Sequence, residues 1–339
     1  MMDAPETFDL TIIGGGPVGL YAAYYAGLRQ LKTKIVDSLD QLGGQLATLY
    51  PEKYIYDIPG FPRVVARDLV HSLTEQGLQY HPAVCLGETV QSLKFDDGVY
   101  DITSDNACHR TRTILICAGA GAFHSRKLSI PDANRFEDAG VYYSVKEKQV
   151  FAGKRVMIIG GGDSAIDWVL NLSDIASKII LVHRRNQFRA HEDSVARALH
   201  LGTEFWSFWE IKSVLHADGK VCGAVLWNNR THEHRNVDAE AILVQIGFLS
   251  SLGAMKTWPM EIIGNTIVVD QHMRTTLPGV FAAGDVAGYD GKLKLIATGF
   301  GEAAMAVNFA KTLVDPKARA FPGHTSEMGP QTLTTVVAN

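Results

Sequence analysis

The chain has 339 residues, of which 46% are apolar, and this is enough to build two domains that each have a hydrophobic core. Its formal net charge of −4 offers no basic surface for nucleic acid or for an anionic membrane, so we expect neither as a partner. No apolar run is long enough to span a membrane, and the acidic start of the sequence lacks the basic and apolar regions of a signal peptide.

The four cysteines, Cys85, Cys108, Cys117 and Cys222, are scattered along the chain. No two of them have the C-x-x-C spacing or the spacing of metal ligands, so we expect no metal site. We interpret each as a small buried hydrophobic residue. A reducing cytoplasm is then the expected compartment.

The first predicted domain opens with an apolar strand at residues 8–13, a glycine-rich turn at 14–19, a helix at 20–31 and a second strand at 33–36. The turn has the spacing G-x-G-x-x-G, and an aspartate closes the second strand. Together these features are the βαβ fingerprint of a dinucleotide-binding site. The alternative is an ordinary loop in which glycine is needed only because the backbone adopts positive φ angles. This alternative leaves the flanking strands and the aspartate unexplained.

Each residue of this fingerprint has a physical role. Gly14 permits the tight turn, Gly16 lets the backbone approach a pyrophosphate, and Gly19 lets the helix pack close to the strand. The helix N-terminus presents unpaired N–H groups and the positive end of its dipole to the phosphates. The carboxylate of Asp37 is expected to accept hydrogen bonds from both ribose hydroxyls.

Two short stretches follow that suit a flat ligand. Gly43 and Gly44 allow the backbone to pack against such a ligand, and Gln45 supplies an amide for hydrogen bonds. In the aromatic and proline-rich stretch after them, Tyr50 could stack on an aromatic cofactor. Taken alone, the glycines are also typical of an ordinary loop. Tyr50 could likewise be an ordinary tyrosine at the rim of a pocket or in the core.

The rest of this part of the chain predicts a helix at residues 67–77 and an antiparallel strand pair at 89–95 and 99–103. A buried strand at 113–118 then ends in a glycine-rich turn at 119–123, which is a second place where backbone can meet a ligand.

The dinucleotide pattern then starts again. A strand at residues 155–159 runs into a G-x-G-x-x-A turn that contains Gly160, Gly162 and Ser164, and a helix at 166–176 follows. The chain therefore carries two dinucleotide folds in tandem, as an internal repeat of structure.

The second fold ends differently from the first, because its strand at residues 179–182 is closed by arginines. Arg184 and Arg185 follow the strand, with Arg189 after them. A carboxylate accepts from a ribose 2′-OH but repels a 2′-phosphate, whereas guanidinium groups hold phosphate oxygens bidentately. We therefore expect the first site to bind FAD or NAD and the second to bind NADPH. The alternative for the arginines is a solvated basic face.

Near its end, the chain again shows sequence patterns like those of the first domain. Asp285 lies in a turn directly after a buried strand, where its carboxylate is well placed to accept hydrogen bonds from ribityl hydroxyls. Residues 295–302 then open a helix over 303–313, whose N-terminus could stabilise negative charge on a reduced flavin ring. One site for FAD and one for NADPH predict a flavoprotein that transfers hydride.

These patterns predict an α/β fold with two Rossmann-like dinucleotide-binding domains, of which the NADPH domain is inserted into the FAD domain. We place the first part of the FAD domain at residues 1–123 and the NADPH domain at 124–245. The second part of the FAD domain, with a C-terminal tail, takes residues 246–339.

The sequence resembles the two-dinucleotide-binding flavoprotein superfamily, and within it the thioredoxin-reductase branch. The resemblance runs over residues 8–325, and its motifs are the two glycine turns at 14–19 and 160–165, the stretch 43–46, the arginines after residue 183 and the stretch 276–285. Thioredoxin reductases carry a C-x-x-C dithiol just before the second nucleotide-binding strand. Here residues 141–148 hold no cysteine, so reduction through a dithiol is excluded.

The subfamily with this architecture and no dithiol is that of the thioredoxin-reductase-like ferredoxin–NADP(+) reductases, which the chain resembles at residues 49–57, 118–123, 294–303 and 321–325. The resemblance implies FAD contacts at Pro17, Asp37, Gln45, Tyr50, Val90, Phe123, Asp285 and Thr325. It implies that Tyr50 stacks on one face of the flavin and that the tail, here His324, covers the other, often from the partner subunit of a homodimer. Without the resemblance, His324 is an exposed tail histidine.

The implied reaction is hydride transfer between NADPH and FAD, followed by single-electron transfer with ferredoxin or flavodoxin. Hydride transfer requires placement of the reacting atoms rather than a side-chain acid or base, so we name no catalytic residue. Two alternatives stay open. One is an NADPH diaphorase that acts on quinones or free flavin, and the other is a non-catalytic FAD- and NADPH-binding redox sensor.

Overall fold

The computed structural model describes residues 6–130, 132–145, 147–190 and 192–323. The chain divides into two compact units: unit 1 comprises Met1–Thr48, Tyr54–Ala122 and Ser250–Asn339, and unit 2 comprises Leu49–Lys53 and Phe123–Leu249. The division expected from the sequence differs mainly at Leu49–Lys53. This segment groups with unit 2, although the chain on both sides of it belongs to unit 1.

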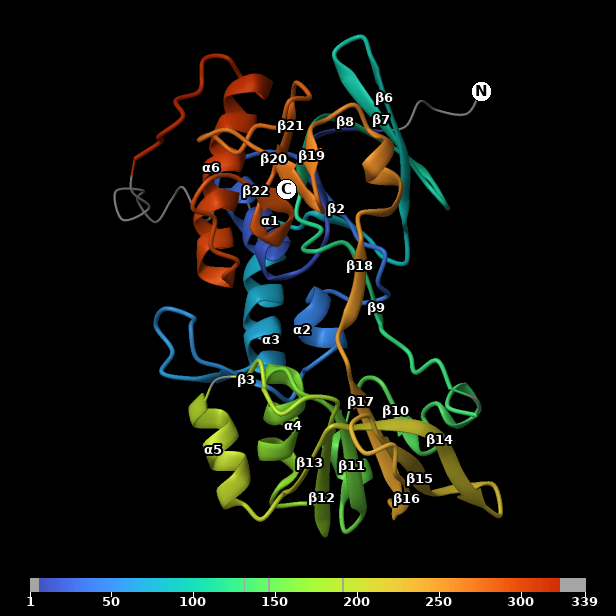
Figure 1. Cartoon of the computed structure of the whole chain (residues 1–339). Coiled ribbons are helices and arrows are strands. Elements are labelled where there is room, and N and C mark those ends of the chain that lie inside the picture. Colours follow the sequence, from blue (N-terminus) through green and yellow to red (C-terminus); the bar gives the residue numbers. More distant parts are fainter. Residues whose placement is uncertain (1–5, 131, 146, 191, 324–339) are drawn as a thin grey trace. The chain divides into compact units, whose positions relative to one another are not determined.

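Unit 1 is built on a seven-stranded sheet with the strand order β5-β2-β1-β8-β7-β6, in which β21 also pairs with β8 (Figure 1). The strands are β1 (Thr7–Ile13), β2 (Thr33–Val36), β5 (Ala83–Cys85), β6 (Val90–Asp96), β7 (Val99–Ser104), β8 (Cys108–Ile116) and β21 (Val280–Ala282). β5, β2, β1, β8 and β21 run parallel, whereas β6 and β7 form an antiparallel hairpin beside β8. The last two residues of β1, the last three of β8 and all of β21 are apolar and buried, because both faces of the sheet are covered there.

The helices of unit 1 are α1 (Pro17–Leu28), α2 (Gly44–Thr48), α3 (Ala66–Gly77) and α6 (Ile296–Val314). α1 packs against both α3 and α6. Proline at the first helical position starts α1, since its missing N–H would have no intrahelical partner there. Smaller elements complete the unit: β3 (Tyr54–Ile55), β4 (Val64–Val65), β19 (Ile262–Ile263), β20 (Thr266–Val268), β22 (Ala287–Gly288) and the 3₁₀ helices η3 (Gly253–Thr257) and η4 (Gly284–Val286).

Unit 2 contains a parallel five-stranded sheet with the order β10-β17-β11-β12-β13. Its elements are β10 (Val141–Tyr142), β11 (Arg155–Gly160), α4 (Asp163–Leu172), β12 (Lys178–His183), α5 (Glu192–His200), β13 (Glu204–Ser207) and β17 (Ala241–Gln245), with the 3₁₀ helices η1 (Asn134–Phe136) and η2 (Lys148–Phe151). A second, antiparallel sheet is formed by β14 (Trp209–Ala217), β15 (Lys220–Asn228) and β16 (His234–Asp238). This second sheet was not predicted from the sequence.

The alternation of side chains along β11 divides the core of unit 2 into two layers. Val156 and Ile158 belong to the cluster that includes α4, whereas Met157 and Ile159 belong to the cluster that includes β14 and β15. The central sheet is therefore buried on both faces, as a parallel sheet requires.

Apart from the segment Leu49–Lys53, the chain passes between the units at two extended segments, β9 (Ala122–Ser125) and β18 (Phe248–Ser251), which pair as a two-stranded sheet. Within the described parts of the chain, no helix combines the length and the apolar character needed to cross a bilayer.

Candidate functional site

The first glycine turn follows β1, and the three glycines of its G-x-G-x-x-G motif meet very different surroundings. At Gly14, where φ is +108°, an added Cβ would lie 2.5 Å from the carbonyl oxygen of Cys117. At Gly19 it would lie 1.9 Å from the Gly14 carbonyl oxygen. At Gly16 the nearest atom is the Gly44 Cα, at 3.8 Å. The outer glycines are thus required by the protein's own packing, and the middle one leaves exposed backbone for a ligand to approach.

The second glycine turn, after β11, repeats this arrangement in unit 2. Gly160 has a φ of +154°, and an added Cβ would lie 2.3 Å from the Gln245 carbonyl oxygen. At Gly162 no atom lies within 4 Å of the Cβ position. Gly162 is the N-cap of α4, so Ser164 lies in the first turn, where backbone N–H groups have no intrahelical acceptor. Both turns therefore fit the pyrophosphate of a dinucleotide.

Asp37, directly after β2, is held by two backbone N–H groups. The Gly15 N–H donates to Oδ2 at 2.5 Å and the Leu39 N–H donates to Oδ1 at 2.8 Å. The residue is only 7% exposed, and this burial raises the pKa of Asp37 above the ordinary aspartate value, against the opposing effect of the two N–H groups. Each carboxylate oxygen keeps a lone pair, so the side chain fits the two hydroxyls of a ribose.

We predict that Asp37→Asn weakens FAD binding about 10- to 100-fold, because one ribose hydroxyl loses a charged acceptor. Fluorescence of released FAD measures the dissociation constant. In the wild type, affinity should fall on acidification, and because the pKa of Asp37 is raised the fall should begin above the ordinary value of 3.8. Asp37→Asn should lack this step.

The matched control is Asp97→Asn, on the exposed turn between β6 and β7. Asparagine tolerates the positive φ of +47° at this position, so the control should bind FAD as the wild type does. Equal affinities for the Asp37 and Asp97 variants would refute the role of Asp37.

Other predicted FAD residues of unit 1 lie around the same turn. The Gly43 N–H donates to the Gly15 carbonyl oxygen at 2.8 Å, which joins the two glycine-rich loops. The Gln45 amide nitrogen lies 3.1 Å from the position that a Cβ on Gly119 would take. Pro17 is the first residue of α1. Val90 is buried at the start of β6, two residues after Glu88, whose N–H donates to the Asp37 carbonyl oxygen at 2.9 Å.

Asp285 lies in η4, just after β21 in the sheet. The turn that carries it is anchored at the preceding residue, because the Gly284 N–H donates to Oε2 of Glu302 at 2.8 Å. Glu302 is buried in α6 and was not singled out from the sequence. The available signal was a carboxylate within an otherwise apolar, small-residue helix, since such a group is rarely buried without partners.

The three predicted arginines of unit 2, Arg184, Arg185 and Arg189, are all exposed after β12. The loop that carries them is tied to the glycine turn, because the Arg189 N–H donates to the Gly161 carbonyl oxygen at 2.8 Å. Unit 2 thus brings together the residues expected to bind the 2′-phosphate and the turn expected to bind the pyrophosphate.

Two further residues hold the arginine loop, and sequence reasoning gave neither of them this role. The half-buried His183 ring lies where a Cβ on Gly161 would come within 2.3 Å, and its Nε2 donates to the Gln187 carbonyl oxygen at 3.2 Å. Burial, together with the neighbouring arginine charges, lowers the pKa of His183. The Asn229 amide donates to the Arg184 carbonyl oxygen at 2.9 Å.

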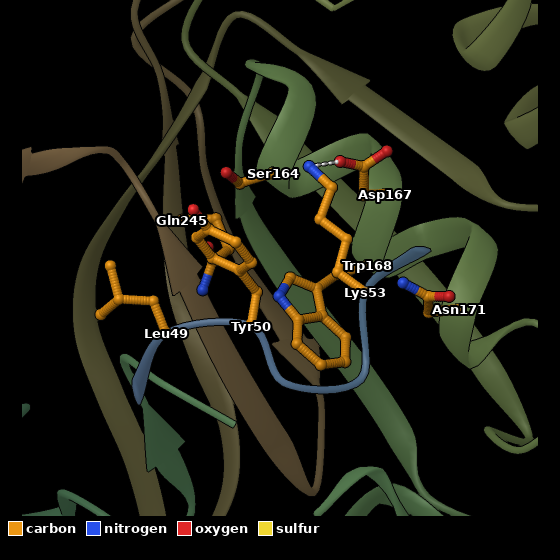
Figure 2. Close-up of a pocket in the computed structure, with 8 residues that line it drawn as sticks. All are labelled: Leu49, Tyr50, Lys53, Ser164, Asp167, Trp168, Asn171 and Gln245. Atoms are coloured by element: carbon orange, nitrogen blue, oxygen red, sulfur yellow. Dashed lines mark ion pairs between the residues drawn. The ribbon is translucent and has the colours of Figure 1, made fainter. Parts of the chain in front are cut away.

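Tyr50 is grouped with unit 2 rather than with the predicted FAD residues of unit 1. Figure 2 shows it among the residues that line a pocket. The pocket is lined by residues of the Leu49–Lys53 segment, of α4 and of β17: Leu49, Tyr50, Lys53, Ser164, Asp167, Trp168, Asn171 and Gln245. Lys53 forms an ion pair with Asp167, and the Lys53 N–H donates to the Tyr50 carbonyl oxygen at 3.0 Å. Stacking of Tyr50 on a flavin stays a prediction.

Three predicted contacts lie wholly or partly outside the described residues. The Phe123 backbone belongs to β9, but its side chain is not described. His324 and Thr325 follow the last described residue, so the capping role of the tail stays a prediction.

Comparison with known proteins identifies the family. The family model of pyridine nucleotide-disulphide oxidoreductase matches residues 8–307. Ferredoxin–NADP reductase 2 of Shouchella clausii is 49% identical over 330 residues, which are 97% of this chain and 100% of that protein. Ferredoxin–NADP reductase of Geobacillus thermodenitrificans is 47% identical over 324 residues, which are 95% of this chain and 98% of that protein.

Solved structures agree with this assignment. Thioredoxin reductase of Lactococcus lactis matches with a TM-score of 0.78 and 26% identity, over 91% of this chain and 99% of that one. Thioredoxin reductase of T. acidophilum has a TM-score of 0.79 over 92% of this chain and 99% of that one, and at 22% identity it is evidence of fold alone. The expected α/β fold with two Rossmann-like sheets is confirmed. The chain belongs to the pyridine nucleotide-disulphide oxidoreductase family, among its thioredoxin-reductase-like ferredoxin–NADP reductases.

Proposed function

We propose that the chain is a ferredoxin–NADP(+) reductase that binds FAD in unit 1 and NADPH in unit 2. One contrast carries the proposal. The first glycine turn lies beside the buried carboxylate of Asp37, and the second lies beside three exposed arginines. The first site therefore favours a free ribose and the second a 2′-phosphate. The names of the similar proteins support ferredoxin as the second substrate.

The residues of the chain act by binding and orientation. Bound FAD supplies a ring that exchanges hydride with NADPH and single electrons with a one-electron carrier. The N-terminus of α1 would hold the FAD pyrophosphate, Asp37 the ribose and Asp285 the ribityl hydroxyls. The N-terminus of α4 would hold the NADPH pyrophosphate. Hydride transfer needs the two reacting atoms held about 3–3.5 Å apart, and this requires placement without a side-chain acid or base.

The path of electrons out of the protein follows from the cysteines. All four are free, and none has a neighbour at C-x-x-C spacing. The interpretation of each as a buried residue is wrong for Cys108 and Cys222, which are exposed, and for Cys85, which is half-buried. Cys117 is buried, and burial raises its pKa, so it is an inert thiol. Because a relay needs two adjacent thiols, electrons would leave directly to a docked carrier, ferredoxin or flavodoxin.

The test is an anaerobic reaction in two parts. NADPH is mixed with the purified protein while flavin absorbance is followed, and ferredoxin is then added with cytochrome c as the final acceptor. Fast bleaching and a strong dependence on ferredoxin are expected. Bleaching that does not lead to ferredoxin-dependent reduction would indicate a diaphorase. The absence of bleaching would indicate a redox sensor.

We further propose that the protein is a homodimer and works in the cytoplasm. The family resemblance, in which the tail covers the flavin of the partner, supports the dimer, and the unpaired cysteines agree with a reducing compartment. Size-exclusion chromatography with light scattering tests the dimer, and the mass of a monomer at micromolar protein concentration would refute it.

A further inference from the structure

Three side chains outside the glycine motifs converge in unit 1 beside the turn that carries Asp285. Glu302, near the start of α6, accepts hydrogen bonds at Oε1 from the Tyr289 hydroxyl, at 2.6 Å, and from the Lys292 ammonium group. Its other oxygen, Oε2, accepts the Gly284 N–H at 2.8 Å. One carboxylate thus joins α6, the turn after β21 and the loop after β22.

This cluster places a full ion pair in the interior. The side chains of Lys292 and Glu302 are only 7% and 5% exposed. A buried ion pair contributes little net stability, because the desolvation cost of two charges offsets their attraction. Burial and the contact with Glu302 raise the pKa of Tyr289 to about 12, so its hydroxyl remains a donor at neutral pH. Each of the three side chains has a partner within the cluster, and stability alone does not account for it.

The Gly284 peptide is the group that the cluster orients. Gly284 has a φ of +81°, a conformation that L side chains rarely adopt, and a Cβ there would lie 3.2 Å from Val18. A Cβ on Gly299 of α6 would lie 3.2 Å from the Gly284 Cα, so the helix packs directly on the turn. The hydrogen bond to Glu302 then sets the direction of the Gly284 N–H. This N–H belongs to the Ala283–Gly284 peptide plane. The Gly284 backbone carries the orientation on to Asp285, because Val18 and Gly299 pack on it and its carbonyl oxygen accepts the Ala287 N–H.

We propose that Glu302 is a positioning residue for FAD: it orients the Gly284 peptide and thereby the Asp285 carboxylate, while Lys292 and Tyr289 hold the Glu302 carboxylate in place. This inference rests on the proposed function, because it takes FAD as the ligand of Asp285. A packing role would require only that the buried charges stay balanced. A positioning role also requires an acceptor for the Gly284 N–H.

Two double variants separate these roles. K292M/E302Q and K292M/E302L both remove the two buried charges and keep side chains of similar size. The glutamine amide oxygen still accepts the Gly284 N–H, whereas leucine leaves it without an acceptor. Each purified holoprotein is diluted, and the fluorescence of released FAD gives its dissociation constant. The midpoint potential of the bound flavin and the thermal unfolding of each protein are recorded beside it.

K292M/E302L is expected to bind FAD about tenfold or more weakly, because a buried N–H is left unpaired, and to show a shifted flavin potential. K292M/E302Q is expected to stay within about threefold of the wild type. Binding of NADP+ to unit 2 should be the same in all three proteins. If K292M/E302L does not fold, K292M/E302M takes its place with the same expectation.

Equal FAD dissociation constants and potentials for the two double variants would overturn the positioning role and leave the proposed function intact. A wild-type protein that binds no FAD would overturn the proposed function, and this inference with it. The two failures are therefore distinguished before any variant is compared.

Discussion

Replacing Arg184 and Arg185 together with alanine is expected to raise the KM for NADPH at least about 100-fold while changing the KM for NADH less than about threefold. Both side chains are exposed after β12 and would contact only the 2′-phosphate. Each charge-assisted contact to a phosphate contributes about 1.5–3 kcal/mol, so the loss of two is large and is confined to the phosphorylated cofactor. Stopped-flow bleaching of the flavin with either nucleotide measures both constants.

The control for this result is Arg197→Ala, which removes an exposed arginine from α5 in the same unit. It changes the net charge of the unit without touching the loop after β12, so the ratio of NADPH to NADH constants should stay at the wild-type value. If the double variant lost activity with NADPH and NADH equally, the arginines would act through general charge or through folding. Recognition of the 2′-phosphate would then be refuted.

Gly162→Ala is expected to weaken NADPH binding about 10- to 100-fold and to lower the free energy of unfolding by only about 1 kcal/mol, the cost of alanine at a helix N-cap. No atom lies within 4 Å of the added methyl group, and the glycine has a φ of −101° and a ψ of 179°, an extended conformation that alanine adopts readily. The methyl group would instead occupy the space expected for the pyrophosphate. Calorimetric titration with NADP+ measures the loss, and FAD content should stay at the wild-type level because FAD binds in unit 1.

Gly160→Ala is the matched comparison, because it adds the same methyl group two residues earlier. There φ is +154° and the new Cβ would lie 2.3 Å from the Gln245 carbonyl oxygen. We expect a loss of about 2–5 kcal/mol in the free energy of unfolding, from backbone strain and overpacking together. Unaltered NADP+ affinity in Gly162→Ala would contradict the assignment of the open glycine to the ligand.

Local sequence patterns were most reliable where the backbone itself sets the requirement. The strand predicted at residues 33–36 is β2, and the strand predicted at 155–159 is β11, which is one residue longer. The predicted antiparallel pair at 89–95 and 99–103 is formed by β6 and β7. These signals depend on residues close in sequence, namely on side-chain alternation and on glycines at strand ends.

Local patterns failed where packing overrides propensity. The predicted helix at residues 303–313 begins earlier, because α6 starts at Ile296. Gly299 and Gly301 lower the helix propensity of the residues before 303. At Gly299, however, a Cβ would lie 2.5 Å from a methyl group of Val18, so close packing on α1 requires the glycine inside the helix. Such a requirement is visible only when α1 and α6 are placed side by side.

Short local patterns with a direct chemical meaning were enough to predict the two glycine turns, the acid after one, the arginines after the other, and the absence of a dithiol. The grouping of Leu49–Lys53 with unit 2, and the hydrogen bond from the Gly284 N–H to Glu302, 18 residues away along the chain, became visible in the folded structure. Such contacts depend on segments that meet after folding. Residue spacing sets the local backbone conformation, whereas the partner of a buried polar group depends on how the folded elements pack.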